Sequence, residues 1–249
     1  MLVYLIPLIS PDVCKDWKRV SILCERTVRC LLASPNENLR VVLVGNKIPF
    51  SLDDKRLHLI EEDFELPKSW EDGHTDKYCK IERGLVFCRR WEEFWLMKVD
   101  ADDLVSTRVP EFVENLPADA SGALVERGYV HPFGKSFCFK QGNFHIFCGT
   151  SSILRVSLED LPTEVTGENF DFLPMKLGHN IVKEHFEKLG NPLHSIPFPA
   201  AVYSVGHGEN HSGLSWPPKS RKQLLKKLLR IRAIGMGLEK RFPGMNQKF

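Results

Sequence analysis

Short apolar runs alternate with amphipathic stretches in the first hundred residues, and this alternation constrains the fold more than any other feature. The apolar runs are typical of buried strands, at Leu2–Ile9, Leu39–Val44, Leu57–Ile60 and Phe94–Val99. Between them, residues 16–33 and 76–90 carry apolar side chains at helical spacing. Parallel strands need such crossovers and are buried on both faces. We therefore predict an α/β fold with a central, mainly parallel sheet flanked by helices on both faces.

The pattern changes after residue 105. Residues 123–129 and 136–139 predict two hairpin strands around a Pro-Phe-Gly turn. The apolar run 144–148 predicts a further strand, residues 177–189 a helix, and residues 200–205 a short strand. There is no internal repeat and no low-complexity linker, so we treat residues 1–215 as one domain.

Charge is unevenly distributed along the chain. The 34 Lys and Arg nearly balance 32 Asp and Glu, but residues 219–249 hold ten cations and one acid, Glu239. Apolar side chains at helical spacing predict a basic amphipathic helix over residues 219–238, in a tail of residues 216–249. Such a helix suits an anionic membrane surface. The alternative is that it packs on its own domain. No nucleic-acid-binding motif is present, so we expect no nucleic-acid partner.

The N-terminus and the cysteines indicate the compartment. The apolar run Met1–Ile6 lacks a basic flank and stops at Pro7, which is too short for a signal peptide or a membrane span. The seven cysteines have no C-x-x-C spacing, which favours free thiols in a reducing compartment. We expect a cytoplasmic protein, which the basic helix would hold at the inner face of the membrane.

Three carboxylates directly follow the last of the alternating strands. They are Asp100, Asp102 and Asp103. Period-two alternation would place Asp100 and Asp102 on the same side of the chain. Two converging carboxylates repel each other unless a cation neutralises them, and a hard divalent ion with positions left for phosphate oxygens fits that need. The alternative is that Asp102 or Asp103 caps a helix that begins at Leu104.

The run Val99-Asp100-Ala101-Asp102-Asp103 resembles the Asp-x-Asp motif of glycosyltransferases with the GT-A fold. The order of parts agrees: the first strand and helix, and a second strand that ends in Gly45-Asn46, resemble the nucleotide-binding half of that family. Residues 200–212 resemble its closing segment, in which a His supplies a metal ligand. The similarity covers about residues 1–215 and is nearest in character to bacterial sugar transferases of rhamnosyltransferase type.

The resemblance implies a hexosyl- or deoxyhexosyl-transferase that moves a sugar from a nucleoside-diphosphate sugar to a glycan, lipid-linked or other hydroxyl acceptor. It implies that Asp102 ligates Mn²⁺ or Mg²⁺, that Asp100 contacts the ribose or the metal through water, and that His207 completes the metal shell. His211 is the alternative ligand, and the alternative for His207 is an ordinary surface His, because Gly206 and Gly208 also suit a simple turn. Further candidates for binding the donor are Lys80, Arg83, Arg26 and Asn46. For Lys80 and Arg83 the alternative is an exposed helix face.

Acidic residues in the loop at residues 167–172 are candidates for the general base that an inverting transferase needs. The Glu-Asp pair that the resemblance implies is interrupted by Asn169, which leaves the choice open between Glu168 and Asp171; we favour Asp171 slightly. An ordinary solvated loop is the alternative. His179 is a candidate for reaching the acceptor or for a structural role at a helix end. Residues 149–152 would bring the backbone close to a sugar, or form a plain turn.

Other functions fit less well. A nucleotidyltransferase would carry a Gly-rich loop followed by Lys after the first strand, where this chain has Pro7-Leu8-Ile9-Ser10-Pro11. A phosphatase of haloacid-dehalogenase type would place its Asp-x-Asp after the first strand. A non-catalytic nucleotide-binding or scaffold protein of the same fold is the alternative outside enzymes.

Overall fold

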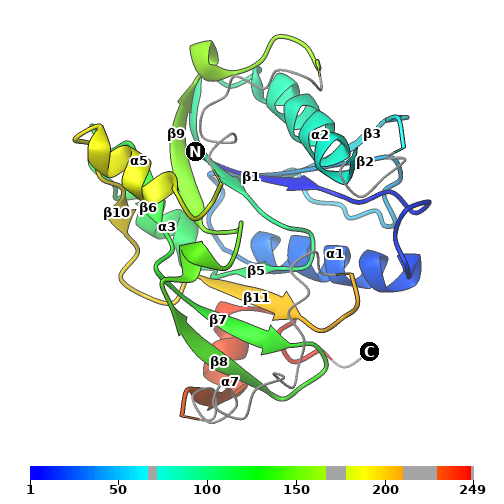
Figure 1. Cartoon of the computed structure of the whole chain (residues 1–249), viewed down its shortest axis with the longest axis vertical. Helices are drawn as coiled ribbons and strands as arrows, with labels where there is room; N and C mark the ends of the chain where they lie inside the picture. Colours follow the sequence, from blue (N-terminus) through cyan, green and yellow to red (C-terminus); the bar gives the residue numbers. More distant parts are fainter. Residues whose placement is uncertain (67–71, 167–177, 210–228, 248–249) are drawn as a thin grey trace.

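The computed structural model describes residues 1–66, 72–166, 178–209 and 229–247. These residues form two β-sheets, one of seven strands and one of five, with helices packed against both (Figure 1). No helix in these ranges is both long and apolar enough to cross a membrane. All seven cysteines are free thiols, and five of them are buried.

The seven-stranded sheet has the order β10-β6-β9-β4-β1-β2-β3. Its strands are β1 (Leu2–Pro7), β2 (Leu39–Gly45), β3 (Leu57–Glu61), β4 (Glu93–Lys98), β6 (Gly122–Leu124), β9 (Ser152–Ser157) and β10 (His194–Ser195). β1 runs parallel to both β2 and β4, and β2 runs parallel to β3. Only β9 is antiparallel to its neighbours β4 and β6. The predicted mainly parallel sheet is confirmed.

Two long helices, α1 (Trp17–Leu32) and α2 (Asp72–Cys88), cover opposite faces of this sheet (Figure 1). Successive side chains of β1 alternate between them, so that Tyr4 packs in the core on the α1 side and Leu5 in the core on the α2 side. α2 approaches β1 closely at Gly84, where a Cβ atom would lie 2.2 Å from Leu5 Cδ1. The prediction of helices on both faces is therefore confirmed.

The five-stranded sheet has the order β12-β8-β7-β11-β5. Its strands are β5 (Leu104–Val105), β7 (Arg127–Pro132), β8 (Phe137–Gly142), β11 (Ala201–Val205) and β12 (Ile231–Ala233). The shorter helices are α3 (Val109–Glu114), α5 (Val182–Lys188) and α7 (Met236–Arg241), with 3-10 turns η1 (Phe144–Ile146) and η2 (Leu158–Asp160). α1 contacts this sheet as well, because Cys30 joins a buried cluster with Val202 and Phe242.

Two strand predictions are wrong in the second half. The strand expected at 123–129 is two strands, β6 and β7, and they belong to different sheets. The strand expected at 144–148 is the 3-10 turn η1, in which Phe144 and Cys148 are buried while Ile146 and Phe147 are exposed. Buried residues four apart follow helical rather than strand periodicity, and the apolar run concealed this.

The predicted basic helix at 219–238 is also wrong in its described part. Residues 210–228 lie outside the described ranges. From Ile231 to Ala233 the chain forms β12, which pairs antiparallel with β8, and α7 begins only at Met236. Gly235 precedes α7 in an extended conformation and ends any continuous helix.

Candidate functional site

The carboxyl ends of β1 and β4 form the place where this sheet is expected to bind a ligand. β1 has β2 on one side and β4 on the other, so the strand order reverses beside it. In open α/β sheets, ligands bind beyond the carboxyl ends of the strands at such a reversal. Asp100, Asp102 and Asp103 follow β4 at this edge.

The backbone turns immediately after β4, and this turn separates the first two carboxylates. β4 ends at Lys98, Ala101 and Asp102 lie in a turn, and the N–H of Asp103 donates to the carbonyl of Asp100 at 3.0 Å. Side chains alternate only along an extended strand. The alternation on which that prediction rests therefore ends with β4, and Asp100 and Asp102 each contact a different element.

Asp100 contacts α2 and the loop before β9. Its Oδ1 accepts a hydrogen bond from Lys77 Nζ at 2.7 Å, and its N–H donates to Thr150 Oγ1 at 3.0 Å. Burial by itself would raise the pKa of Asp100, but the ammonium groups of Lys77 and Lys98 lower that pKa to about 2. Asp100 is therefore an ionised carboxylate at neutral pH.

The side chain of Lys98, two residues before Asp100, makes no hydrogen bond or ion pair with any residue in the described ranges. Burial, together with the nearby charge of Lys77, lowers its pKa to about 8. Gly149 packs closely against both charged groups: a Cβ atom there would lie 3.7 Å from Lys98 Nζ and only 3.2 Å from Asp100 Oδ2. A partly buried cation whose side chain has no ion pair in the described ranges is suited to an anionic ligand.

Asp102 faces the end of β11 instead. Its Oδ2 lies 2.7 Å from Nε2 of His207, although 105 residues separate the two in the sequence. Arg26 of α1 holds the turn in place through two hydrogen bonds. It donates to the carbonyl of Asp102 at 2.7 Å and to Ser204 Oγ at 2.8 Å. Arg26 is 3% exposed, so in this structure it positions Asp102 and is not placed to contact a donor directly.

The pair Asp102 and His207 fits a divalent ion in spacing. Adjacent ligands of an octahedral ion with bonds of about 2.1 Å lie about 3 Å apart, close to the observed 2.7 Å between Asp102 Oδ2 and His207 Nε2. His207 Nδ1 accepts from the N–H of Glu209 at 3.3 Å, so a neutral ring carries its proton on Nε2. A metal on Nε2 would displace that proton. Among the described residues no third His, Cys, Asp or Glu joins this pair to form a group that could hold a metal.

Asp103 is fully buried and joins three segments of the chain. Its carboxyl accepts from Thr150 Oγ1 at 2.7 Å, from Cys148 Sγ at 3.0 Å and from the N–H of Ser204 at 3.2 Å. Burial, with the charges of Asp102 and Asp100, raises the pKa of Asp103 well above its usual range. No helix begins at Leu104, which lies in β5, so the capping alternative is wrong.

The basic residues chosen from the sequence of α2 are engaged elsewhere. Lys80 is fully buried and its Nζ lies 2.7 Å from Asp76 Oδ2. Arg83 is ion-paired with Glu62. Lys77 is the residue of this helix that reaches the carboxylates. Its role was missed because it depends on how α2 is rotated against β4.

Asn46 lies at the end of β2 as expected, and its Nδ2 donates to the carbonyl of Phe64 at 2.8 Å. Its buried Oδ1 has no hydrogen-bond partner among the described residues. Lys98 was also missed, although its position at the end of β4, two residues before Asp100, was a usable signal.

The candidates for the general base, Asp171 and Glu168, and the alternative ligand His211 lie outside the described residues. His179 is described, and its Nδ1 lies 2.6 Å from the carbonyl of His145, which identifies Nδ1 as the donor. The charge that a protonated His179 would carry also lowers the pKa of Asp100.

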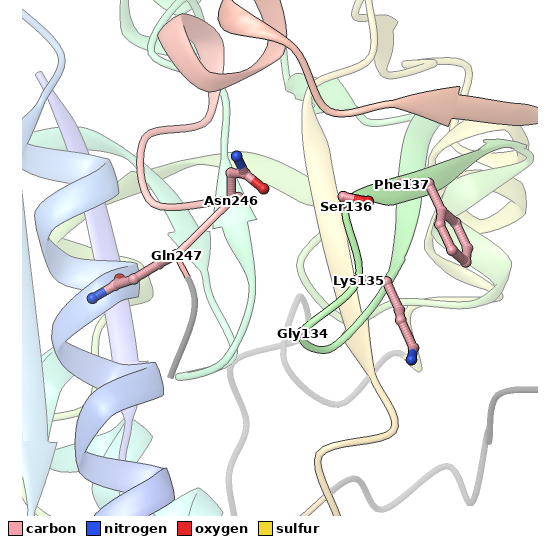
Figure 2. Close-up of a pocket in the computed structure, with 6 residues that line it drawn as sticks. All are labelled: Gly134, Lys135, Ser136, Phe137, Asn246 and Gln247. Atoms are coloured by element: carbon pink, nitrogen blue, oxygen red, sulfur yellow. The ribbon is translucent and has the colours of Figure 1, made fainter.

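A pocket of about 260 Å³ lies away from the carboxylates, between the β7–β8 turn and the C-terminal segment (Figure 2). It is lined by Gly134, Lys135, Ser136, Phe137, Asn246 and Gln247. These residues include no carboxylate and no His, so the pocket is not part of the site at β4.

No family model and no curated protein matches the chain. Similar solved structures include residues 1–349 of TarS from S. aureus (TM-score 0.40, 8% identity, 82% of this chain and 60% of that chain). They also include an active-site mutant of LgtC (TM-score 0.42, 10% identity, 96% and 99%) and the glycosyltransferase GlyE from Streptococcus pneumoniae TIGR4 (TM-score 0.39, 11% identity, 91% and 60%). The chain thus spans 60% of the TarS fragment and of the GlyE chain.

Proposed function

We propose that the protein is a metal-dependent glycosyltransferase that moves a sugar from a nucleoside-diphosphate sugar to a hydroxyl acceptor. The observation that carries this proposal is the contact of Asp102 with His207 at 2.7 Å, at the carboxyl edge of a mainly parallel sheet. The Asp-x-Asp sequence after β4 and a His after a late strand are the two features that the resemblance to GT-A enzymes requires.

Asp102 and His207 are the residues that would hold Mn²⁺ or Mg²⁺, and the imidazole favours Mn²⁺. When bound, the ion would stabilise the charge that develops on the leaving diphosphate. Arg26 and Asp103 keep the turn in place through the hydrogen bonds to Asp102, Ser204 and Thr150. The chain thus fixes both ligands from elements buried in its core.

Lys98 and Lys77, the two cations beside Asp100, would supply positive charge for the diphosphate of the donor. Lys77 already neutralises Asp100, whereas Lys98 has no ion pair within the described ranges. A diphosphate would supply the anionic partner that the Lys98 side chain lacks among the described residues. This assignment replaces Lys80 and Arg83, which are paired with Asp76 and Glu62.

A general base is still needed to accept the proton of the acceptor hydroxyl if the reaction inverts the anomeric centre. Asp171 and Glu168 remain predictions for that role. The hexosyl or deoxyhexosyl class of the sugar and a glycan or lipid-linked acceptor are also part of the proposal, from the resemblance alone.

A thermal-shift screen of UDP, GDP, CDP and dTDP, each with and without Mn²⁺, tests the donor half of the proposal. We expect one nucleotide to raise the melting temperature only with the metal, because a ligand that binds the folded state stabilises it. Release of that nucleoside diphosphate from its sugar conjugates would then establish transfer or hydrolysis. No shift with any nucleotide would favour the scaffold alternative.

A further inference from the structure

Cations from two distant segments lie on one face of the five-stranded sheet. In the β8–β12 ladder, Cys138 lies opposite Arg232, and residues directly opposite in an antiparallel pair share a face. The N–H of Lys140 donates to the carbonyl of Arg230 at 3.0 Å, which continues the ladder. Since side chains alternate, Lys140 and Arg230 lie on the same face as Cys138 and Arg232.

α7 packs on this same face and adds two more cations. Phe242, directly after α7, is buried with Cys138, and its ring meets that of Tyr129 edge-on at 5.9 Å between centroids. Lys240 and Arg241 on α7 are exposed. We call Lys140, Arg230, Arg232, Lys240 and Arg241 the basic face. In Figure 1, β8, β12 and α7 lie together at one end of the molecule.

The charges of the basic face are not neutralised within the described ranges. None of its five residues makes an ion pair there. The one acid among residues 127–142 and 229–247 is Glu239, and its carboxylate accepts from the backbone N–H groups of Gly244 and Asn246. The same two segments contain seven Lys and Arg. The basic face therefore presents net positive charge to solvent.

Two large apolar side chains lie next to these cations in the sequence and are unusually exposed. Met236, at the start of α7, is 92% exposed, and Leu229, just before Arg230, is 85% exposed. No other large hydrophobic side chain in the described ranges exceeds 62%. Aliphatic side chains among cations are typical of surfaces that dock on a lipid interface.

We propose that the basic face binds the surface of a bilayer that contains anionic lipid, with Met236 of α7 inserted among the headgroups. The cations supply the attraction to anionic headgroups and the Met236 side chain supplies apolar burial. Surfaces for single-stranded nucleic acid instead combine cations with aromatic side chains on which bases stack. The two most exposed large apolar side chains here are both aliphatic. This proposal does not rest on the proposed glycosyl transfer.

Co-sedimentation of the full chain with vesicles tests the proposal. The vesicles are phosphatidylcholine alone or phosphatidylcholine with phosphatidylglycerol. We expect binding only to the anionic vesicles, and binding that weakens as salt is raised. Replacing three cations of the basic face, as Lys140→Gln/Arg232→Gln/Lys240→Gln, should lower the partition coefficient by roughly tenfold or more. The matched control, Lys18→Gln/Lys47→Gln/Lys188→Gln, removes the same charge from exposed residues elsewhere and should bind like the parent protein.

Three results would overturn the proposal. One is unchanged vesicle binding by the basic-face variant when its melting temperature shows that it is folded. Another is an equal loss in the control variant, which would mean that net charge alone drives binding. The third is binding of tRNA in place of anionic vesicles. Met236→Ser tests the apolar part separately, since it should weaken binding but keep its salt dependence.

Discussion

The carboxyl end of β4 and the basic face are both rich in charged residues, but their surroundings differ: the carboxylates at β4 have partners within the protein, whereas the cations of the basic face are exposed to solvent. At β4, Asp100 lies against Lys77, Asp102 against His207, and Asp103 is buried among hydrogen-bond donors. On the basic face, five exposed cations have no ion pair in the described ranges. A buried charge must be paired, whereas an exposed one is solvated by water. Substitutions should therefore affect catalysis or stability in the first region and only association in the second.

The sharpest test of the difference is Asp102→Asn. The substitution removes the charge of a proposed metal ligand but keeps its size, and we expect a loss of two to three orders of magnitude in kcat/KM. Turnover of the donor identified by the thermal-shift screen is the measurement. Asp119→Asn, at an exposed position, is the control. Full activity of the Asp102 variant would contradict the proposed function.

Asp103→Ala should have the largest effect on stability. It leaves Thr150, Cys148 and the N–H of Ser204 without their acceptor in a buried position, and we expect a loss of about 3 kcal/mol in the free energy of unfolding. Urea unfolding measures it. Asp103→Asn keeps an acceptor and should lose clearly less. Equal losses in both variants would mean that the carboxyl matters through its volume or charge and not through these hydrogen bonds.

Lys98→Met and Lys80→Met should separate binding from stability. Lys98 has no ion pair among the described residues, so its replacement should weaken nucleoside-diphosphate binding by about tenfold and leave the fold intact. Lys80 is the buried partner of Asp76, so its replacement should destabilise the protein. Calorimetric titration and thermal melting measure the two effects. If nucleotide affinity depends on Lys80 and not on Lys98, Lys80 is the donor-binding residue, as predicted from the sequence.

Stability should fall on mild acidification because of His131. Burial lowers its pKa, its Nε2 contacts the carbonyl of Lys135 at 2.8 Å, and its buried Nδ1 has no partner in the described ranges. The unfolded chain therefore binds a proton more readily. The contribution of His131 is present above about pH 6.5 and is lost as the pH falls through the folded pKa.

His131→Phe removes the titrating group and should reduce this dependence by about 1 kcal/mol between about pH 7.5 and pH 5. Urea unfolding at the two pH values is the measurement, with the exposed His194→Phe as control. A pH dependence identical to that of the parent protein would show that His131 does not titrate in this window.

The smallest effect on stability is expected on the basic face. The variant Lys140→Gln/Arg232→Gln/Lys240→Gln changes exposed side chains without ion pairs in the described ranges, so the free energy of unfolding should change by less than about 0.5 kcal/mol. Urea unfolding measures it in parallel with the vesicle experiment. A large loss would mean that these cations take part in the fold and would remove the contrast between the two regions.

Local patterns predicted the first half of the fold well, because each apolar run and each helical stretch there keeps one clear periodicity. The strands at 2–7, 39–45, 57–61 and 93–98 and the two helices between them lie within a few residues of the predicted ranges. In the second half, segments pair with distant partners. Residues 122–124 and 127–132 belong to different sheets, and residues 231–233 form a strand only because β8 offers an edge.

The sequence by itself determined the parallel core and the place where acidic residues follow β4, because burial and side-chain periodicity are local properties of the chain. Only the tertiary structure decided which partners those residues meet. In the folded chain His207 contacts Asp102, 105 residues away in the sequence, and Lys77 forms an ion pair with Asp100. Lys140 and Arg232 lie on one face of the five-stranded sheet. The physical reason is that the rotation of a helix and the register of a ladder are fixed by packing between segments, which no local pattern specifies.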